Sequence, residues 1–352
     1  MIQNIGRHTV RVFGRTVMDG GMLWLLSSLS GIGFRVAGAR RLEIMLESDD
    51  TTADPARKHL TPRFDVLVDG DIVIDRCMKE REETVTVFDS GKPWGAEIRF
   101  RKLSECTQSI LAIREIRTDG KIVPLEEKGT KIEFIGDSVT CGYGVEGKSE
   151  LEGFTTATEN AGKSYAGLVT EWMGLDSMLT CFSGYGIVSG YTDDPERRNT
   201  GELVPPYYEV AGRNAFTLPS GRRPEEIPWD FSSWQPDIVC IRLMTNDNNG
   251  MNERRSFETD RETVIRGGMK LIRKVRKHNA RAKIVWVLPG TDCHPELAAE
   301  AVKRMQEEGF TDLYTFTLPD YGPGDLGARW HPNAEWNRMA GELLGSYLKT
   351  IV

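Results

Sequence analysis

The sequence predicts two domains: an N-terminal antiparallel β-sandwich of jelly-roll type, and a C-terminal α/β/α domain built on a parallel sheet. Three observations support this prediction. The chain has 352 residues, which corresponds to about two domains of ordinary size. In the first third of the chain, apolar and polar side chains alternate with the period of two that half-buried strands show. In the remainder, apolar strands alternate with helical patterns, which is typical of a parallel sheet covered on both faces.

The first region consists of short alternating runs, spaced by turn signals, with no long helical pattern between them. The runs are Ile32, Phe34 and Val36; Leu42, Ile44 and Leu46; Phe64, Val66 and Val68; Val85 and Val87; and Ala96, Ile98 and Phe100. Asp69-Gly70 follows the third run and is a strong signal for a two-residue hairpin. Short strands in this arrangement indicate a sandwich.

A polar, turn-rich segment at 118–129 connects the two regions, and we predict domains at 1–122 and 123–352. Beyond it, four apolar strands alternate with four helical patterns. The predicted strands are Ile132–Ile135, Met178–Phe182, Ile238–Leu243 and Ile284–Leu288, and the predicted helices are Tyr165–Met173, Val264–Val275, Pro295–Met305 and Ala334–Leu348. In such a domain, catalytic and binding residues collect at the carboxyl ends of the strands.

Composition narrows the expected partners and location. With 45 Lys and Arg against 52 Asp and Glu, the net charge is -7, so nucleic acid is not an expected partner. No apolar run approaches the ~20 residues that cross a bilayer, so a membrane is not expected either. The first residues lack the pattern of a signal peptide. The six cysteines are scattered without a C-x-x-C pair, which favours free thiols in a reducing compartment. We therefore expect a cytoplasmic protein, or a secreted one if a leader has been trimmed.

Polar residues follow three of the predicted strands in turn. Asp137 and Ser138 follow the first strand, Gly184 follows the second, and Asn246 and Asp247 follow the third. A serine in a tight turn can act as a nucleophile, and backbone amides or a side-chain amide can donate hydrogen bonds to an oxyanion. Each block alone is typical of an ordinary loop. Their occurrence at successive strand ends indicates a catalytic site.

A serine nucleophile needs a base, which is normally histidine, and the chain has five. His8 and His59 lie in the β region. His278 closes a basic helix, where it is expected to interact with the helix dipole. His294 follows a strand and is a rival, although the proline after it is typical of a helix start. His331 lies just before the last helix and is the base that we favour.

These blocks resemble those of the SGNH (GDSL-type) hydrolases, in the same chain order. More narrowly, residues 135–144 (IGDSVTCGYG) are similar to carbohydrate esterase family 2, as are 183–186, 229–231 and 234–237. That family joins an N-terminal jelly roll to an SGNH domain, so the resemblance covers nearly the whole chain. It implies an acetyl xylan esterase-like enzyme that deacetylates xylan- or mannan-derived sugars or oligosaccharides through an acyl-enzyme, without a metal or an organic cofactor.

The resemblance also implies a role for each block. Ser138 would be the nucleophile and His331 the general base. The backbone amides of Ser138 and Gly184, with the side chain of Asn246, would form the oxyanion hole. Asp137 and Asp247 would be structural, the first holding the nucleophile's turn and the second holding the asparagine loop.

Four aromatic residues near these blocks are candidates for a sugar-binding pocket. They are Trp330, Tyr143, Tyr185 and Trp229. Ordinary packing is an equal alternative for all of them except Trp330, which adjoins the proposed base.

Two positions depart from the family pattern. Met244 stands two residues before the block asparagine, where glycine is usual, and this bears on the geometry of the loop. Ala328 stands three residues before the histidine, where an aspartate usually orients the ring. The backbone carbonyl of Ala328 could orient the ring instead, giving a Ser–His dyad. Asp325 and Asp292 are the alternative acids.

Two other functions stay open at this point. One is a lipid or thioester hydrolase, because the SGNH scaffold hosts many acyl groups and a fold does not fix a substrate. The other is a carbohydrate-binding protein that has lost catalysis, for which Met244 and Ala328 are the support.

Overall fold

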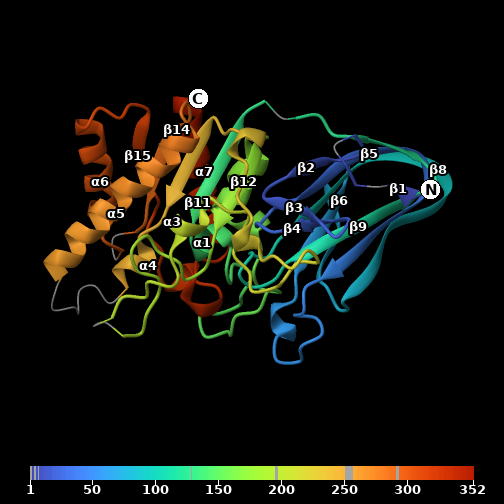
Figure 1. The fold of residues 1–352 in the computed structure, drawn as a ribbon, viewed down its shortest axis with the longest axis horizontal. Coiled ribbons are helices and arrows are strands. Elements are labelled where there is room, and N and C mark those ends of the chain that lie inside the picture. The colour runs from blue at the N-terminus through green and yellow to red at the C-terminus, as the bar shows by residue number, and fades with distance from the viewer. Residues whose placement is uncertain are drawn as a thin grey trace.

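The computed structural model describes residues 2–3, 5–6, 8–127, 129–194, 197–249, 257–290 and 293–352. Figure 1 shows an antiparallel β domain, coloured blue to cyan, beside an α/β domain coloured green to red. This two-domain architecture confirms the predicted fold class. None of the helices within these ranges has the length and apolar character needed to cross a membrane.

Ten strands of the described chain form a single antiparallel sheet in the first domain. They are β1 (Ile2–Gln3), β2 (Arg11–Phe13), β3 (Thr16–Asp19), β4 (Met22–Leu25), β5 (Gly31–Ser48), β6 (Arg63–Val68), β7 (Asp71–Cys77), β8 (Glu82–Lys102), β9 (Leu111–Thr118) and β10 (Lys121–Pro124). The order is β3-β4-β9-β5-β8-β6-β7, with β1 beside β9 and with β2 and β10 beside β5. The predicted hairpin joins β6 to β7, and Asp69 and Gly70 both have the positive φ that its turn requires.

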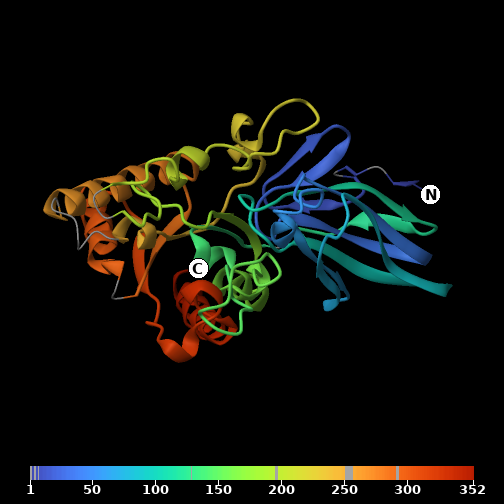
Figure 2. The same ribbon diagram turned by 90° about the horizontal axis from the view of Figure 1, so that it is seen from below.

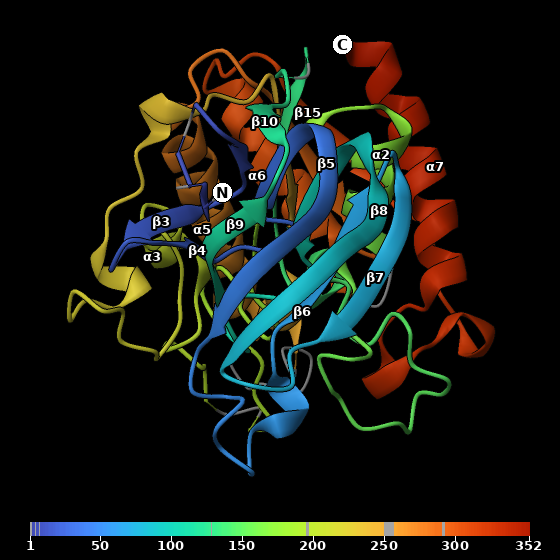
Figure 3. The same ribbon diagram turned by 90° about the vertical axis from the view of Figure 1, so that its right-hand side faces the viewer.

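Two pairs of predicted short strands are each one long strand. β5 contains the runs at 32–36 and 42–46, and β8 contains those at 85–87 and 96–100. The pairing of β5 with β8 shifts register between Val36 and Glu43, and such bulges bend and twist strands. The bends in the two long strands therefore let one continuous sheet curve around the apolar core of the first domain. Figure 3 shows β5 and β8 running side by side along the domain.

The second domain contains a five-stranded parallel sheet in the order β12-β11-β13-β14-β15. Its strands are β11 (Lys131–Gly136), β12 (Asp176–Cys181), β13 (Ile238–Arg242), β14 (Lys283–Leu288) and β15 (Leu313–Thr317). The first four match the predicted strands. β15 was not predicted, because it lies at the edge of the sheet and does not form an apolar run: only Leu313 is buried, and partly buried residues alternate with exposed ones in the rest of the strand.

Helices cover both faces of this sheet. α2 (Tyr165–Trp172) packs with α7 (Ala334–Ile351) on one face, and α5 (Phe257–His278) packs with α6 (Pro295–Glu307) on the other (Figure 2). Three of the predicted helices lie within these elements, and the fourth, Tyr165–Met173, extends one residue beyond the end of α2. The other helices that the structure describes are the single turns α1 (Ser138–Cys141), α3 (Val204–Tyr207) and α4 (Thr245–Asn248), and the 3-10 turns Lys58–Leu60, Ala161–Lys163, Pro224–Glu226, Phe231–Ser233, Pro323–Asp325 and Ala328–Trp330.

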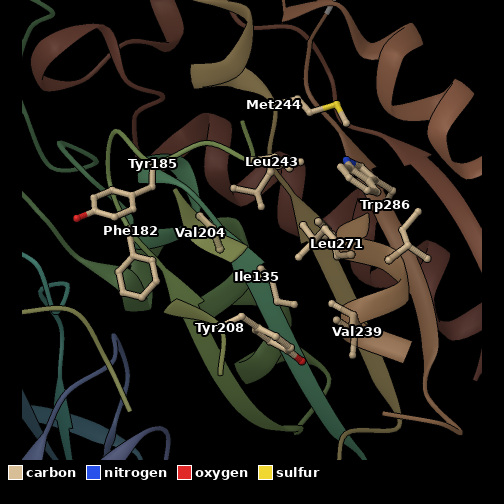
Figure 4. Packing of buried hydrophobic residues seen from close by; sticks show 14 of the residues in the cluster. Ile135, Phe182, Tyr185, Val204, Tyr208, Val239, Leu243, Met244, Leu271 and Trp286 are labelled. Carbon is tan, nitrogen blue, oxygen red and sulfur yellow. The ribbon is translucent and has the colours of Figure 1, made fainter. Parts of the chain in front are cut away.

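The two domains share a buried interface. The apolar cluster beneath α5 and α6, part of which is drawn in Figure 4, continues into the first domain through Trp24, Leu26 and Ile110. A buried ion pair crosses the same interface, because Arg15 contacts Glu133 of β11 at 3.2 Å. Removing one partner of such a pair would leave an uncompensated buried charge, so the pair ties the two domains in one arrangement.

Candidate active site

Ser138 begins a single turn of helix directly after β11. The Asp137 carboxylate caps this turn by accepting a hydrogen bond from the Val139 amide at 3.1 Å. Gly142 ends the turn with a φ of +72°, and a β-carbon there would lie 2.3 Å from the Asn160 carbonyl oxygen. The turn therefore requires a glycine at its end, and Ser138 is held at the carboxyl end of a central strand.

Asp137 also binds Arg242, the last residue of β13. Nη1 of Arg242 lies 2.8 Å from Oδ1 and 3.1 Å from Oδ2, and both side chains are buried. This pair fixes the start of the serine turn to the neighbouring strand. The contacts of Asp137 agree with a structural role, because both of its partners hold the turn.

His331 contacts the serine. Its Nε2 lies 2.8 Å from the Ser138 Oγ, and its Nδ1 lies 2.7 Å from the backbone carbonyl oxygen of Arg329. A carbonyl oxygen can only accept, so Nδ1 carries the proton in this hydrogen bond. In the neutral ring Nε2 is then free to accept the hydroxyl proton of Ser138, as a general base must.

The carbonyl that orients the ring belongs to Arg329, and the prediction of Ala328 was wrong in this respect. The Ala328 carbonyl instead accepts from the backbone amide of His331 at 3.3 Å. Arg329 and Trp330 have φ values of 54° and 56°. These two left-handed residues reverse the local chain direction, which turns the Arg329 carbonyl toward the ring.

Of the two alternative acids, Asp325 does not take this place. The Asp325 carboxylate accepts from the Gly322 amide at 3.0 Å, within its own turn. Asp292 lies outside the described residues. The rival base, His294, has its Nδ1 3.1 Å from Glu296 Oε1 at the start of α6.

Burial lowers the pKa of His331 below its ordinary value. The hydrogen bond to the Arg329 carbonyl and the charge of Asp137 act in the opposite direction, while the charges of Arg242 and Arg329 lower the pKa further. A lowered pKa keeps the ring neutral near pH 7, which is the state that can accept a proton from Ser138.

The three loops that carry the predicted oxyanion donors start from strand ends that are in register with one another. Gly136 in β11 pairs with Cys181 in β12 and with Arg242 in β13. The loops that carry Ser138, Gly184 and Asn246 therefore begin next to one another at the carboxyl edge.

Each predicted donor has a hydrogen available. Across the described residues, the backbone amides of Ser138 and Gly184 have no hydrogen-bond partner. The Asn246 Nδ2 donates one hydrogen to the Tyr185 carbonyl at 2.9 Å. This bond holds the side chain in place and leaves its second hydrogen, because an amide nitrogen carries two.

Asp247 connects the asparagine loop to the loop after β12. Its buried carboxylate accepts from the amides of Ile187 at 2.9 Å, Val188 at 2.7 Å and Ser189 at 3.0 Å. Burial raises the pKa of Asp247, whereas these three amides lower it. Its contacts agree with the structural role that the resemblance implied.

Met244 adopts the backbone conformation of the glycine that the family pattern leads us to expect. Its φ is 92° and its ψ is -5°, in the left-handed region that glycine enters most easily. Its side chain is fully buried, with Cε 2.8 Å from where a β-carbon on Gly268 of α5 would lie. Figure 4 shows Met244 near Trp286. The loop thus keeps the glycine-like geometry with a methionine.

Two of the four predicted aromatic residues adjoin the base. Trp330 follows Arg329 and is 55% exposed. Tyr143 stacks on Phe154, with ring centroids 3.8 Å apart, and contacts His331 at 4.5 Å. Tyr143 therefore supports the histidine ring as well as lying near the serine turn.

The other two aromatic residues do not face the site, and the prediction for them was wrong. Tyr185 is buried against Phe182 in the apolar cluster (Figure 4), and only its carbonyl contacts a site residue. Trp229 lies under the Arg15 guanidinium at 5.2 Å. It lines a separate cavity of about 590 Å³ together with Met178, near the amino ends of the parallel strands. Both rings were assigned from their position in the sequence, and packing decides their direction.

Two residues near Gly184 were missed. The Tyr191 side chain is 49% exposed, and its Cβ lies 4.0 Å from where a side chain on Gly184 would begin. The exposed Glu202 carboxylate lies equally close to that point. Both belong to the long polar loop after β12, and this loop's place at a strand end was the available signal.

No family model matches the chain. It is 32% identical over 234 residues to the cellulase/esterase CelE of Acetivibrio thermocellus, a match that covers 64% of this chain and 26% of that protein. It is 25% identical over 313 residues to an acetylxylan esterase / glucomannan deacetylase of Cellvibrio japonicus, covering 82% of this chain and 80% of that protein. The chain thus spans about a quarter of the first relative and four fifths of the second.

Solved structures share the fold over nearly the whole chain. A family two carbohydrate esterase from Clostridium thermocellum, in complex with cellohexaose, has a TM-score of 0.80 at 24% identity and covers 97% of this chain and 98% of its own. The acetyl xylan esterase Est2A from Butyrivibrio proteoclasticus has a TM-score of 0.85 at 21% identity, with 99% and 98% covered. The resemblance found in the sequence is therefore confirmed: the chain is homologous to proteins named as esterases and has the two-domain fold of the family 2 carbohydrate esterases.

Proposed function

We propose that this protein is a serine esterase of the carbohydrate esterase family 2 type, which removes O-acetyl groups from acetylated sugars or oligosaccharides. One observation carries the proposal. The Ser138 Oγ lies 2.8 Å from His331 Nε2, at the edge of the sheet where the Gly184 amide has no hydrogen-bond partner among the residues that the structure describes. Relatives named as acetylxylan esterases support the acetyl group as the acyl group that is removed.

The reaction proceeds through an acetyl-enzyme. His331 Nε2 takes the Ser138 proton as Oγ attacks the acetyl carbonyl, and the negative oxygen of the tetrahedral intermediate accepts hydrogen bonds from Ser138, Gly184 and Asn246. The intermediate collapses when His331 returns the proton to the departing sugar oxygen. Water then attacks acetyl-Ser138 with His331 again as base, and acetate leaves.

The geometry supports a dyad in place of a triad. The Arg329 carbonyl holds the Nδ1 proton and stabilises the imidazolium through a dipole. A carboxylate would supply a full charge to the ring. Asp137, whose charge raises the pKa of the ring, is already paired with Arg242.

The surroundings of the serine support a sugar over a long acyl chain. Trp330, which adjoins His331, and Tyr191, which lies beside Gly184, both have exposed rings. The side chains of Arg329 and Glu202, at the same two places, are exposed as well. Aromatic faces combined with charged and polar groups suit a hydroxylated ring, whereas a lipid chain needs a continuous apolar channel. The names of the Cellvibrio relatives suggest acetylated xylan- or mannan-derived oligosaccharides as substrates.

The test is hydrolysis of p-nitrophenyl acetate, butyrate and octanoate, together with acetate release from acetylated xylo- and manno-oligosaccharides. We expect acetyl esters to be preferred. Ser138→Ala should keep the circular dichroism spectrum of the wild type and lose nearly all activity. The control is Ser177→Ala, at the amino end of β12 and away from the carboxyl edge of the sheet, and its activity should equal that of the wild type.

Each alternative function has its own outcome in this experiment. Preference for octanoate would indicate the lipid hydrolase. If calorimetry detects oligosaccharide binding but no ester is hydrolysed, the protein is a carbohydrate-binding protein that has lost catalysis. More than a tenth of the wild-type rate in Ser138→Ala would contradict the assignment of the nucleophile.

We also propose that the protein works in the cytoplasm, on short acetylated oligosaccharides after their import. Its support is that the six cysteines form no disulfide within the described residues and that four of them are buried, as expected in a reducing compartment. Fractionation of the native host tests this, and protein found mainly in the medium or the cell-wall fraction would overturn it.

A further inference from the structure

A carboxylate from the N-terminal domain reaches two of the three loops that carry the predicted oxyanion donors. Glu105 follows β8 and is fully buried. Its Oε2 accepts a hydrogen bond from the Ser183 amide at 2.8 Å and lies 3.7 Å from the Cys141 Sγ. Ser183 directly precedes Gly184, and Cys141 ends the turn that the nucleophile begins. One oxygen atom therefore joins the nucleophile's turn to the oxyanion loop.

The other polar atoms of Glu105 are anchored too. Its Oε1 accepts from Gln108 Nε2 at 3.2 Å, and its backbone amide donates to Glu159 Oε2 at 3.2 Å. Because three different segments hold the residue, its side chain has little freedom to move. Glu105 can therefore act as a fixed point for the loops that it contacts.

The charges around Glu105 explain how it is tolerated in the interior. Burial raises the pKa of the neighbouring Glu159 well above its ordinary value, the charge of Glu105 raises it further, and the buried Lys102 acts in the opposite direction. A raised pKa favours the neutral form of Glu159, and the positive charge of Lys102 acts against this shift. The hydrogen bonds that Glu105 accepts are the contacts that a buried carboxylate needs in the core.

Gly184 needs such an anchor. It has a φ of +81°, and a side chain there would meet no atom closer than 4.0 Å, so neighbouring atoms do not restrict it. A glycine in this environment has wide conformational freedom. Its peptide unit is held by hydrogen bonds on its two sides: the Ser183 amide donates to Glu105, and the Gly184 carbonyl accepts from Tyr191 at 2.7 Å.

We propose that Glu105 is a positioning residue, by which the N-terminal domain holds the Gly184 amide at the place where the oxyanion forms beside Ser138. Glu105 touches neither the substrate nor the reacting atoms, and it acts through the Ser183 peptide. The inference rests on the proposed function, because a positioned amide matters to kcat only if Ser138 performs acyl transfer. It assigns the N-terminal domain a part in the chemistry.

Three substitutions at one position separate the hydrogen bond from the charge. Glu105→Gln keeps an acceptor oxygen at the same reach and removes the charge, so kcat should stay within about threefold. Glu105→Asp keeps the charge and withdraws the oxygen by one methylene, and Glu105→Ala removes it. Both should lower kcat by about 10- to 100-fold with KM within about threefold, since a misplacement of about 1 Å in an active site costs up to about 100-fold.

A matched control is Asp176→Ala. Asp176 is a buried carboxylate that pairs with Arg11 across the same domain interface, at the amino end of β12 and away from the oxyanion loop. The Asp176→Ala substitution should lower the melting temperature and leave kcat unchanged. All rates are normalised to the fraction of Ser138 that reacts with a p-nitrophenyl phosphonate, so that loss of folded protein does not count as loss of kcat.

A second measurement does not depend on activity. Residue-resolved hydrogen exchange should find the Ser183 amide protected in the wild type and in Glu105→Gln, and exposed in Glu105→Asp, with the β13 amides unchanged in all three. If Glu105→Ala does not fold, Glu105→Asp and this exchange pattern still decide the matter.

The outcomes separate the two proposals. Equal normalised kcat in the Asp and Gln variants, or an unprotected Ser183 amide in the wild type, would overturn the role of Glu105. A wild type that neither turns over any ester nor reacts with the phosphonate would contradict the proposed function, and the exchange pattern would then test the anchoring alone.

Discussion

Met244 provides a test of how the asparagine loop is built. A side chain in the left-handed region costs about 1–2 kcal/mol relative to glycine. Met244 has a φ of 92°, yet its side chain is fully buried near Gly268 and Trp286. We infer that side-chain packing outweighs the backbone strain at this position.

The strain can be isolated by comparing alanine with glycine at two buried methionines. Met305 in α6 is also fully buried, in the same apolar cluster, and has ordinary helical geometry. Truncating either residue to alanine should cost about 2–5 kcal/mol. Going on from alanine to glycine removes one methyl group at both positions and adds the same freedom to the unfolded chain. Only at position 244 does glycine also relieve backbone strain.

We therefore expect the step from alanine to glycine to cost about 1–2 kcal/mol less at 244 than at 305. The free energy of unfolding is measured by urea titration of Met244→Ala, Met244→Gly, Met305→Ala and Met305→Gly, at a common m value. Equal steps at the two positions would refute the reasoning, because they would mean that Met244 carries no strain. In Met244→Gly, kcat should stay near that of the wild type, because the Asn246 donor is kept.

Four further predictions address the site. Asn246→Ala should lower kcat by about 10²–10³-fold with little change in KM, and a change confined to KM would mean that Asn246 only binds substrate. Burial lowers the pKa of His331, and the neutral form of the ring is active, so the acid limb of the pH profile of kcat/KM should lie below pH ~6.5. Arg329→Gln removes a positive charge and should move this limb to higher pH. A limb above pH 7 in the wild type would contradict the prediction. Asp325→Asn should cost less than about tenfold in kcat, whereas a loss of about 10⁴-fold, as in a serine-protease triad, would establish a side-chain acid. Trp330→Ala should raise KM for acetylated oligosaccharides and leave KM for p-nitrophenyl acetate unchanged; equal effects on both would exclude sugar stacking.

The strand ends could be found from the sequence because parallel sheets have a simple rule. The strands after which Ser138, Gly184 and Asn246 occur are adjacent in the sheet, and their ends are in register. Apolar runs identify such strands, so the polar blocks that follow them can be assigned to one edge without knowing any side-chain contact.

Directions of side chains and carbonyls could not be found in this way. Tyr185 directly follows Gly184 and Trp229 belongs to a block that resembles the family, but Tyr185 packs into the core and Trp229 packs against Arg15. The Arg329 carbonyl depends on two left-handed residues in succession, neither of which is a glycine that would signal the turn. The contact of Glu105 with Ser183 spans 78 residues and two domains, so no local pattern contains it.

Because the group that orients His331 is a backbone carbonyl, mutation affects it differently from a side chain. Every amino acid carries a backbone carbonyl, so no single codon change at position 329 deletes the group. Substitution there can only shift the turn, and the residues that tolerate a left-handed φ, chiefly glycine, asparagine and aspartate, would keep it. The charge and shape of the side chain at position 329 can therefore change during evolution while the backbone carbonyl that accepts from His331 Nδ1 is kept.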